Sequence, residues 1–212
     1  MKAIACVLVS VLPASMAAGD VLFDNGVRMI GGNIAEIYHP VTAAPDGSGF
    51  DTYQPFSVTD AGGWSVDTIG FFGRRDENHG VDANGLMHVL LYAWTGSVDT
   101  LGSAIAGANV AFADVSDPDT GPIWVTESFG GLNLAAGDYV IRAQGLDSFS
   151  EVAWHHGETG PNAIGVQLSD GQAFPRGASA AVRINGTVIP APAGSLVLLS
   201  LATAARRRRP VR

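Results

Sequence analysis

Two short polar runs contain the residue types that bind metal ions or transfer protons. They are "RRDENHG", with Asp76, Glu77, Asn78 and His79, and "WHHGE", with His155, His156 and Glu158. Imidazole and carboxylate groups are ligands for zinc and similar ions, but neither run has the spacing of a known zinc motif such as His-Glu-x-x-His. We interpret both runs as polar loops between strands, with a transition-metal site as the alternative.

A third polar run, "DVSDPDTG", spaces oxygen ligands along a loop in a way that suits a calcium ion. Its carboxylates are Asp114, Asp117 and Asp119, and Gly121 follows them. The run lacks the distant glutamate of an EF-hand, and aspartate is frequent in turns because its side chain bonds to the neighbouring backbone. The pattern favours an ordinary turn, with a calcium site as the alternative. We expect no cofactor, and calcium is the better motivated of the two metal alternatives.

Aromatic residues supply the one candidate binding surface. Strand alternation divides "MHVLLYAW" into two faces, one with His88, Tyr92 and Trp94 and the other with Met87, Val89 and Leu91. Trp124 and Trp154 are candidates to extend the first face. Sugar rings stack on exposed aromatic planes, so a carbohydrate-binding face is one interpretation. The other, favoured by the usual burial of aromatic residues, is that these side chains belong to the core.

Catalytic motifs are absent from the sequence. No serine lies in a Gly-x-Ser-x-Gly turn, and neither Gly-x-x-x-x-Gly-Lys nor Gly-x-Gly-x-x-Gly occurs. The sequence therefore predicts a protein that is not an enzyme. A secreted hydrolase with an unrecognised acidic and histidine site is the alternative.

The elements that must position these residues are predicted to be strands. The middle of the chain is rich in glycine and proline and shows no helical periodicity, whereas "AIGVQLS", "SAAVRIN" and "DYVIRAQ" alternate with a period of two. About a dozen such segments, separated by turn signals, predict an all-β fold. We expect a single antiparallel β-sandwich of the jelly-roll-like type, with an N-terminal signal helix and a short hydrophobic helix at the C-terminus.

Two segments make more local predictions. In "VRINGTVI", Asn185 and Gly186 separate two β-prone runs and predict a tight two-residue hairpin. In "WSVDTIGFFG", Trp64 and Val66 alternate out of phase with Ile69 and Phe71, which requires either a bulge or burial on both faces.

The charge of the chain excludes one class of partner. All 20 acidic residues lie between Asp20 and Asp170, and the six arginines from Arg28 to Arg183 leave this middle region with a formal net charge of −14. Such a body is repelled by phosphate backbones, so we expect no nucleic-acid partner.

Both ends of the chain carry targeting features. Lys2, an apolar stretch and the small residues of "PASMAAG" predict a secretory signal peptide over 1–18. The only cysteine, Cys6, lies within it, so the mature chain should have no disulfides and must depend on a large apolar core. At the other end, the apolar run 193–205 would cover only about 20 Å as a helix, less than the roughly 30 Å hydrocarbon core of a bilayer.

The C-terminal tail has three parts in a fixed order: Pro190, Ala191 and Pro192, then the apolar run, then Arg206, Arg207, Arg208 and Arg209. This tail resembles the PEP-CTERM sorting signal, with alanine in place of the usual glutamate. The resemblance implies recognition by an exosortase-like membrane protease, a transient membrane-bound precursor, and delivery to the cell surface or exopolysaccharide matrix. A permanent weak anchor and an ordinary C-terminal helix are the alternatives.

The middle region also looks like the β-rich domains that carry such tails. The likeness rests on "DNG" at 24–26 and on Leu132, Leu134, Gly137 and Tyr139 of "LNLAAGDYVIRA". We therefore expect three parts, a signal peptide at 1–18, a β-sandwich domain at 19–189 and a sorting tail at 190–212. The expected function is that of an exported surface or matrix protein with a structural or polysaccharide-binding role.

Overall fold

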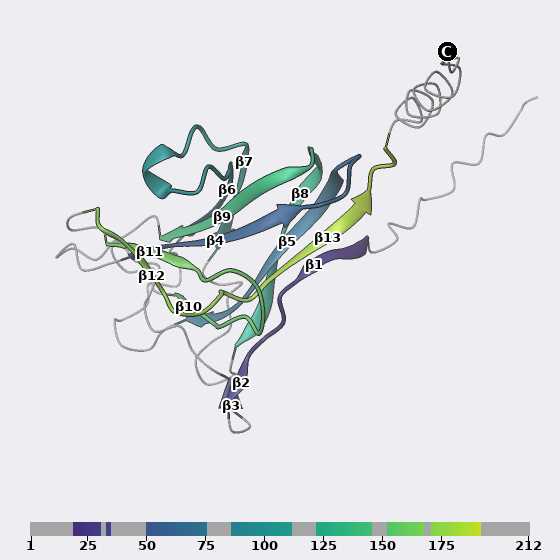
Figure 1. Cartoon of the computed structure of the whole chain (residues 1–212). Helices are drawn as coiled ribbons and strands as arrows, with labels where there is room; N and C mark the ends of the chain where they lie inside the picture. The colour runs from purple at the N-terminus through teal and green to yellow at the C-terminus, as the bar shows by residue number, and fades with distance from the viewer. Residues whose placement is uncertain are drawn as a thin grey trace, which may run out of the picture.

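The computed structural model describes residues 19–30, 33–34, 50–75, 86–111, 122–145, 152–167 and 171–191 (Figure 1). In these ranges the regular elements are strands, apart from one short 3-10 turn at Val98–Thr100. The protein is all-β, with two antiparallel sheets and a small two-stranded ladder. Within the described ranges, no helix has the length and apolar character needed to cross a membrane.

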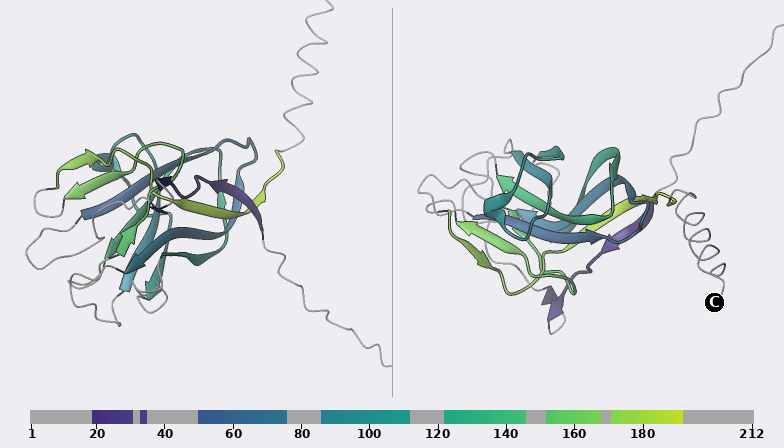
Figure 2. Two further views of the ribbon diagram at one scale, coloured as in Figure 1. Left: turned by 90° about the horizontal axis from the view of Figure 1, so that it is seen from below. Right: turned by 45° about the horizontal axis from the view of Figure 1, so that its top comes forward.

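The five-stranded sheet is organised around β5 (Trp64–Arg75), its central strand. β5 pairs along one edge with β8 (Ile123–Leu134) and along the other with β13 (Val182–Val188) and then β10 (Val152–Trp154). The outermost strand is β1 (Asp20–Asp24), which pairs with β13. Because Asp20 lies opposite Gly186, β1 begins where β13 ends, as Figures 1 and 2 show.

The six-stranded sheet has its strands in the order β12, β11, β4, β9, β6, β7. Their bounds are β12 (Ala173–Pro175), β11 (Ile164–Gln167), β4 (Phe50–Val58), β9 (Gly137–Gly145), β6 (Leu86–Ala93) and β7 (Ala106–Ala111). The two-stranded ladder consists of β2 (Met29–Ile30) and β3 (Asn33–Ile34). Neighbours in space are often far apart in sequence, so long-range pairing determines which side chains meet.

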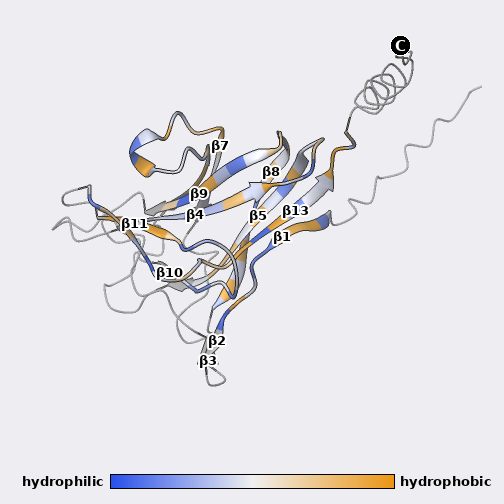
Figure 3. Ribbon diagram, in the orientation of Figure 1, coloured by the Kyte–Doolittle hydropathy of each residue, from blue (hydrophilic) through white to orange (hydrophobic). Residues whose placement is uncertain are grey.

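The main hydrophobic core is built from both sheets. Phe56 and Leu91 come from the six-stranded sheet, Val66 and Ile184 from the five-stranded sheet, and all four are almost fully buried. Hydrophobic and hydrophilic bands are interspersed along the strands (Figure 3), as expected where one face of each strand packs inward. Burial of this apolar surface is the main force that holds the fold together.

The alternation predicted for two segments is confirmed. In β13, Val182 and Ile184 are fully buried in the core while Arg183 lies on the opposite face, half-buried. In β9, Ile141 and Ala143 face the same core, and Arg142 lies on the other side of the sheet. A period of two therefore identified the residues that face the main core in both strands, although the opposite face of β9 is also covered, with Val140 buried in a second cluster.

The irregularity predicted in β5 is a bulge. The register of β5 against β8 shifts between Val66 and Thr68. Trp64 and Val66 before the shift, and Ile69 and Phe71 after it, all belong to the main core. Against β13, β5 has one extra residue at this point, because Val66 lies opposite Gly186 and Thr68 opposite Asn185. The extra residue reverses the alternation, so both halves of this long strand present their large side chains inward.

The hairpin predicted at Asn185 and Gly186 is wrong. Both residues lie inside β13, where the register against β5 shifts between them. A Cβ atom on Gly186 would lie 2.0 Å from the carbonyl oxygen of Ser65, so glycine is needed for the close approach of β5. Asn185 donates from Nδ2 to Oγ1 of Thr68 at 3.0 Å. The same dipeptide that favours a turn also suits a bulged strand, and the local sequence does not distinguish them.

The "DNG" segment ends β1 and ties it to β13. The Asp24 carboxylate accepts a hydrogen bond from the backbone N–H of Gly26 at 2.8 Å, and Gly26 has a φ of 69°, which favours glycine. The side-chain amide of Asn25 makes two hydrogen bonds to the backbone at the start of β13, as a neighbouring strand would. It donates to the carbonyl of Ala180 at 2.6 Å and accepts from the N–H of Val182 at 2.7 Å. These bonds explain the segment as structural.

The leucine, glycine and tyrosine pattern forms the corner between β8 and β9, where the chain passes from one sheet to the other. The Tyr139 hydroxyl donates to the carbonyl oxygen of Ala135 at 2.9 Å, and Leu134 is buried in the core. A tyrosine that bonds back to the backbone just upstream is a corner feature of many β-sandwich proteins. This motif therefore has a structural role at the corner between the two sheets.

Candidate functional site

Three side chains from different strands lie in one row on the outer face of the six-stranded sheet, the face away from the main core. Ser57 of β4 is paired directly with Asp138 of β9. The backbone N–H of Trp94, the residue after β6, donates to the carbonyl of Asp138 at 2.9 Å. Because Tyr139 points into the core, Asp138 points outward. The sheet thus aligns a hydroxyl, a carboxylate and an indole.

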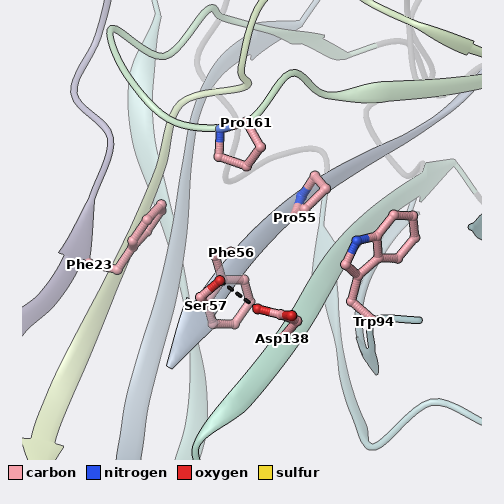
Figure 4. A pocket seen from close by; sticks show the side chains of 7 residues that line it. All are labelled: Phe23, Pro55, Phe56, Ser57, Trp94, Asp138 and Pro161. Atoms are coloured by element: carbon pink, nitrogen blue, oxygen red, sulfur yellow. Dashed lines mark hydrogen bonds between the residues drawn. The ribbon is translucent and has the colours of Figure 1, made fainter. Parts of the chain in front are cut away.

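These residues line an open pocket of about 390 Å³ (Figure 4). Its lining consists of Phe23, Pro55, Phe56, Ser57, Trp94, Asp138 and Pro161. Ser57 and Asp138 are exposed and Trp94 is half-buried, whereas Pro55 and Phe56 are buried. The pocket therefore combines an apolar wall with polar groups that solvent can reach.

The pocket forms where β4 loses one of its neighbours. β11 pairs with β4 only over residues 50–53, while β9 pairs with it over residues 52–58. Pro55 lies in the part beyond β11, and proline has no N–H to leave unpaired at such an edge. On this side Gln54 donates from Nε2 to the carbonyl of Pro161 at 3.1 Å, which places Pro161 at the rim. An interrupted edge thus leaves room beside Pro55.

The polar groups of the pocket are held in position. The Ser57 hydroxyl donates to Oδ1 of Asp138 at 2.6 Å, as Figure 4 shows. Trp94 packs against a second apolar cluster on this face, formed by Tyr53, Tyr92 and Val140. A carboxylate and an aromatic plane whose positions are set before binding lose less entropy when a ligand arrives.

A buried ion pair lies further along the same face. Arg142 of β9 bonds to Asp51 of β4, its guanidinium lies 5.6 Å from the ring centroid of Tyr53, and it is 3.5 Å from the Tyr92 hydroxyl. Burial raises the pKa of Tyr53 to about 12. Burial also raises the pKa of Asp51 against the opposing effect of Arg142. This network joins β4, β9 and β6, the three strands that carry the row of Ser57, Asp138 and Trp94.

The five aromatic and histidine candidates from the sequence lie on three different surfaces. His88, Tyr92 and Trp94 share the outer face of the six-stranded sheet, although Tyr92 is only 8% exposed. Trp154 is 1% exposed in the main core, where its Nε1 donates to the carbonyl of Ala181 at 2.8 Å. Trp124 lies on the outer face of the five-stranded sheet. The candidate face is not extended by Trp124 or Trp154, because β8 and β10 belong to the other sheet.

The second histidine-containing run is placed near the end of β10. His155 is buried, edge-to-face with Phe72 at a centroid distance of 5.7 Å, whereas Glu158 is exposed. Burial lowers the pKa of His156, and the nearby charges of Arg28 and Arg176 lower it further. Within the described ranges, no three His, Cys, Asp or Glu side chains gather in a way that could hold a metal ion.

Other predicted site residues lie at the edge of the described chain or outside it. Three groups of predicted site residues are outside the described residues. They are the run Asp76–His79, the calcium candidates Asp114, Asp117 and Asp119, and Pro192 with the arginine cluster 206–209. Pro190 and Ala191 follow β13 and are exposed. Just before them, the N–H of Ile189 donates to the carbonyl of Gly63 at 2.9 Å.

The pocket is lined by an aromatic plane and a carboxylate. An indole plane offers a partner for the apolar face of a sugar, and a carboxylate accepts hydrogen bonds from its hydroxyl groups. Comparisons give no relative from which a function could be transferred: no protein-family model, curated protein or solved structure matches the chain. The interpretation of the pocket therefore depends on its geometry.

Proposed function

We propose that the protein is an exported cell-surface or exopolysaccharide-matrix protein that binds carbohydrate in the pocket of Trp94, Ser57 and Asp138. The observation that carries this proposal is a half-exposed indole beside an exposed carboxylate in a pocket open to solvent. Sites for sugars commonly pair one stacking plane with a few fixed polar groups, and this pocket supplies both. Its role in the matrix would be to hold polysaccharide.

The fold that presents this pocket is, in our proposal, a single antiparallel β-sandwich of jelly-roll-like type spanning 19–189. Three features support it. The main core takes side chains from both sheets, the consecutive strands β4 and β5 lie in different sheets, and β8 and β9 do so too. The corner bond from Tyr139 to Ala135 is a further feature of sandwich folds.

Export and sorting are proposed from the two ends of the sequence. The signal-like segment 1–18 would direct secretion, and the tail 190–212 would pause in the membrane until an exosortase-like protease removes it. Mass spectrometry of surface-released protein tests this. We expect a C-terminus near Pro192 in the wild type, and retention of the tail when Arg206 to Arg209 are changed to glutamine. Released wild-type protein that still ends in Arg212 would contradict cleavage.

Carbohydrate binding is tested with a polysaccharide array probed by the purified protein, with and without calcium. We expect binding that is lost in Trp94→Ala and kept in Trp124→Ala, a matched change of the tryptophan on the other sheet. Binding that is equal in both variants would place the site elsewhere. Release of reducing sugar during the incubation would instead support the hydrolase alternative.

A further inference from the structure

We infer that the pocket prefers a sugar that carries a protonated amino group, such as a hexosamine unit of a partly de-N-acetylated polysaccharide. This inference rests on the proposed carbohydrate binding and names the chemical class of the ligand. It is carried by the pairing of the Trp94 indole with the Asp138 carboxylate in a pocket where no described lining residue is a cation.

The charge of the lining is the first argument. Among the described residues that line the pocket, Asp138 is the only one with an ionisable side chain. An ionised carboxylate can only accept hydrogen bonds, and its strongest donors are cationic. Ser57 holds one oxygen of this carboxylate at 2.6 Å, which orients the group without neutralising it. A ligand ammonium would supply the missing positive charge, whereas a uronic acid would add a second negative one.

The second argument is that arginine side chains cover other aromatic rings of the protein. Elsewhere in the described structure, guanidinium groups lie over three rings: Arg142 over Tyr53 at 5.6 Å, Arg176 over Phe174 at 5.2 Å and Arg183 over Trp124 at 4.3 Å. Trp94 has no such partner among the described residues and lies beside a carboxylate instead. Tryptophan is the best ring for a cation–π contact, so a ligand cation near Trp94 would gain from both groups at once.

The field of the whole chain acts in the same direction. The middle region carries a formal net charge of −14, since six arginines oppose 20 acidic residues. A negative field raises the local concentration of cationic ligands and lowers that of anionic ones. Salt weakens this contribution, because exposed charges are screened within about 10 Å at an ionic strength of 0.1 M.

The test uses two oligosaccharides with the same backbone, a de-N-acetylated chito-oligosaccharide and its fully N-acetylated form. Titration calorimetry of the exported protein should show roughly five- to tenfold tighter binding of the amino form at low salt, and a smaller ratio at high salt. Asp138→Asn should bring the ratio close to one while keeping the weaker binding that stacking on Trp94 provides. Trp94→Ala should weaken the binding of both forms.

Asp20→Asn is the matched control for Asp138→Asn. It also removes one exposed negative charge, but at the start of β1 on the other sheet, and the ratio should stay near the wild-type value. Equal binding of the two oligosaccharides by the wild type, or an unchanged ratio in Asp138→Asn, would overturn the amine preference and leave carbohydrate binding intact. No binding of either form, nor of any array polysaccharide, would overturn the proposed function as well.

Discussion

Two half-buried tryptophans, one on the outer face of each sheet, have opposite surroundings. Trp124 contacts Phe72 at a centroid distance of 5.4 Å, and the Arg183 guanidinium covers its ring at 4.3 Å. Arg183 is itself held by Asp24, with an Nε to Oδ2 distance of 2.8 Å. Trp94 lies beside Asp138 and lines a pocket. The two side chains share a residue type and an intermediate exposure, but an arginine covers the ring of Trp124, whereas Trp94 lines the pocket.

This difference indicates how a structural aromatic residue can be told from a candidate binding residue. At Trp124 the Arg183 guanidinium covers the ring and is itself paired with a carboxylate, so both side chains have partners within the protein. At Trp94 the neighbouring polar group has the sign that attracts a cation or a sugar hydroxyl. The charge beside an aromatic ring is therefore more informative here than its exposure.

The largest effect is expected at Arg142, whose guanidinium is paired with the buried carboxylate of Asp51. Arg142→Met leaves the Asp51 carboxylate buried without its partner, which should lower the free energy of unfolding by about 3 kcal/mol. Chemical denaturation measures the loss. The double variant Arg142→Met with Asp51→Leu should recover most of it, because no uncompensated charge remains. A double variant as unstable as the single one would show that this network does not stabilise by charge pairing.

The next largest effect is the difference in oligosaccharide affinity between variants of the two tryptophans. Trp94→Ala should weaken oligosaccharide binding by roughly ten- to a hundredfold, the range expected for loss of one stacking plane. Trp124→Ala should change it less than about twofold while lowering stability through the packing it removes. Titration calorimetry and thermal unfolding of both variants provide the comparison. A reversed pattern would mean that the covered tryptophan is the binding residue.

A smaller effect is expected from uncovering Trp124. Arg183→Gln removes a cation–π contact and a partly exposed ion pair, so the free energy of unfolding should fall by about 1 kcal/mol. Oligosaccharide binding should stay unchanged, since the pocket is on the other sheet. If binding of the fully N-acetylated oligosaccharide rose in this variant, exposure of a tryptophan alone would be sufficient for sugar binding. That result would contradict the distinction drawn between Trp124 and Trp94.

The smallest effect is expected at Ser57. Ser57→Ala removes the hydrogen bond that orients Asp138 but leaves the carboxylate and the indole in place. Binding should weaken about two- to fivefold, which corresponds to a typical net hydrogen bond. Ser57→Thr keeps a hydroxyl and should restore part of the affinity. A loss as large as that of Trp94→Ala would show that Ser57 contacts the ligand directly.

The sequence predicted the parts of this fold that depend on local pattern. Alternation identified the core-facing residues of β9 and β13, and the phase break in "WSVDTIGFFG" indicated either a bulge or burial on both faces, of which the structure shows the bulge. The Asn185–Gly186 hairpin failed because a tertiary contact, the approach of Ser65, determines that backbone. Local signals therefore predicted strands better than connections.

Only part of the pocket could be predicted from the sequence, because its residues are brought together by long-range strand pairing. "MHVLLYAW" indicated Trp94, but Ser57 and Asp138 are 81 positions apart and are brought together by the register of β4 against β9. Neither belongs to a recognisable motif. Tyr92 is buried in the second cluster, in agreement with the core interpretation, whereas ligand binding at Trp94, which lines the pocket, stays a prediction.

The central claim is that a sugar binds against Trp94 and not against Trp124. The chain has four tryptophans, so a proton–nitrogen NMR spectrum of the indole groups is simple enough to assign with the Trp94→Ala and Trp124→Ala variants. During titration with the amino oligosaccharide, the Trp94 indole signal should shift progressively and saturate, while those of Trp64, Trp124 and Trp154 stay in place. A shift of the Trp124 signal with an unchanged Trp94 signal would contradict the account.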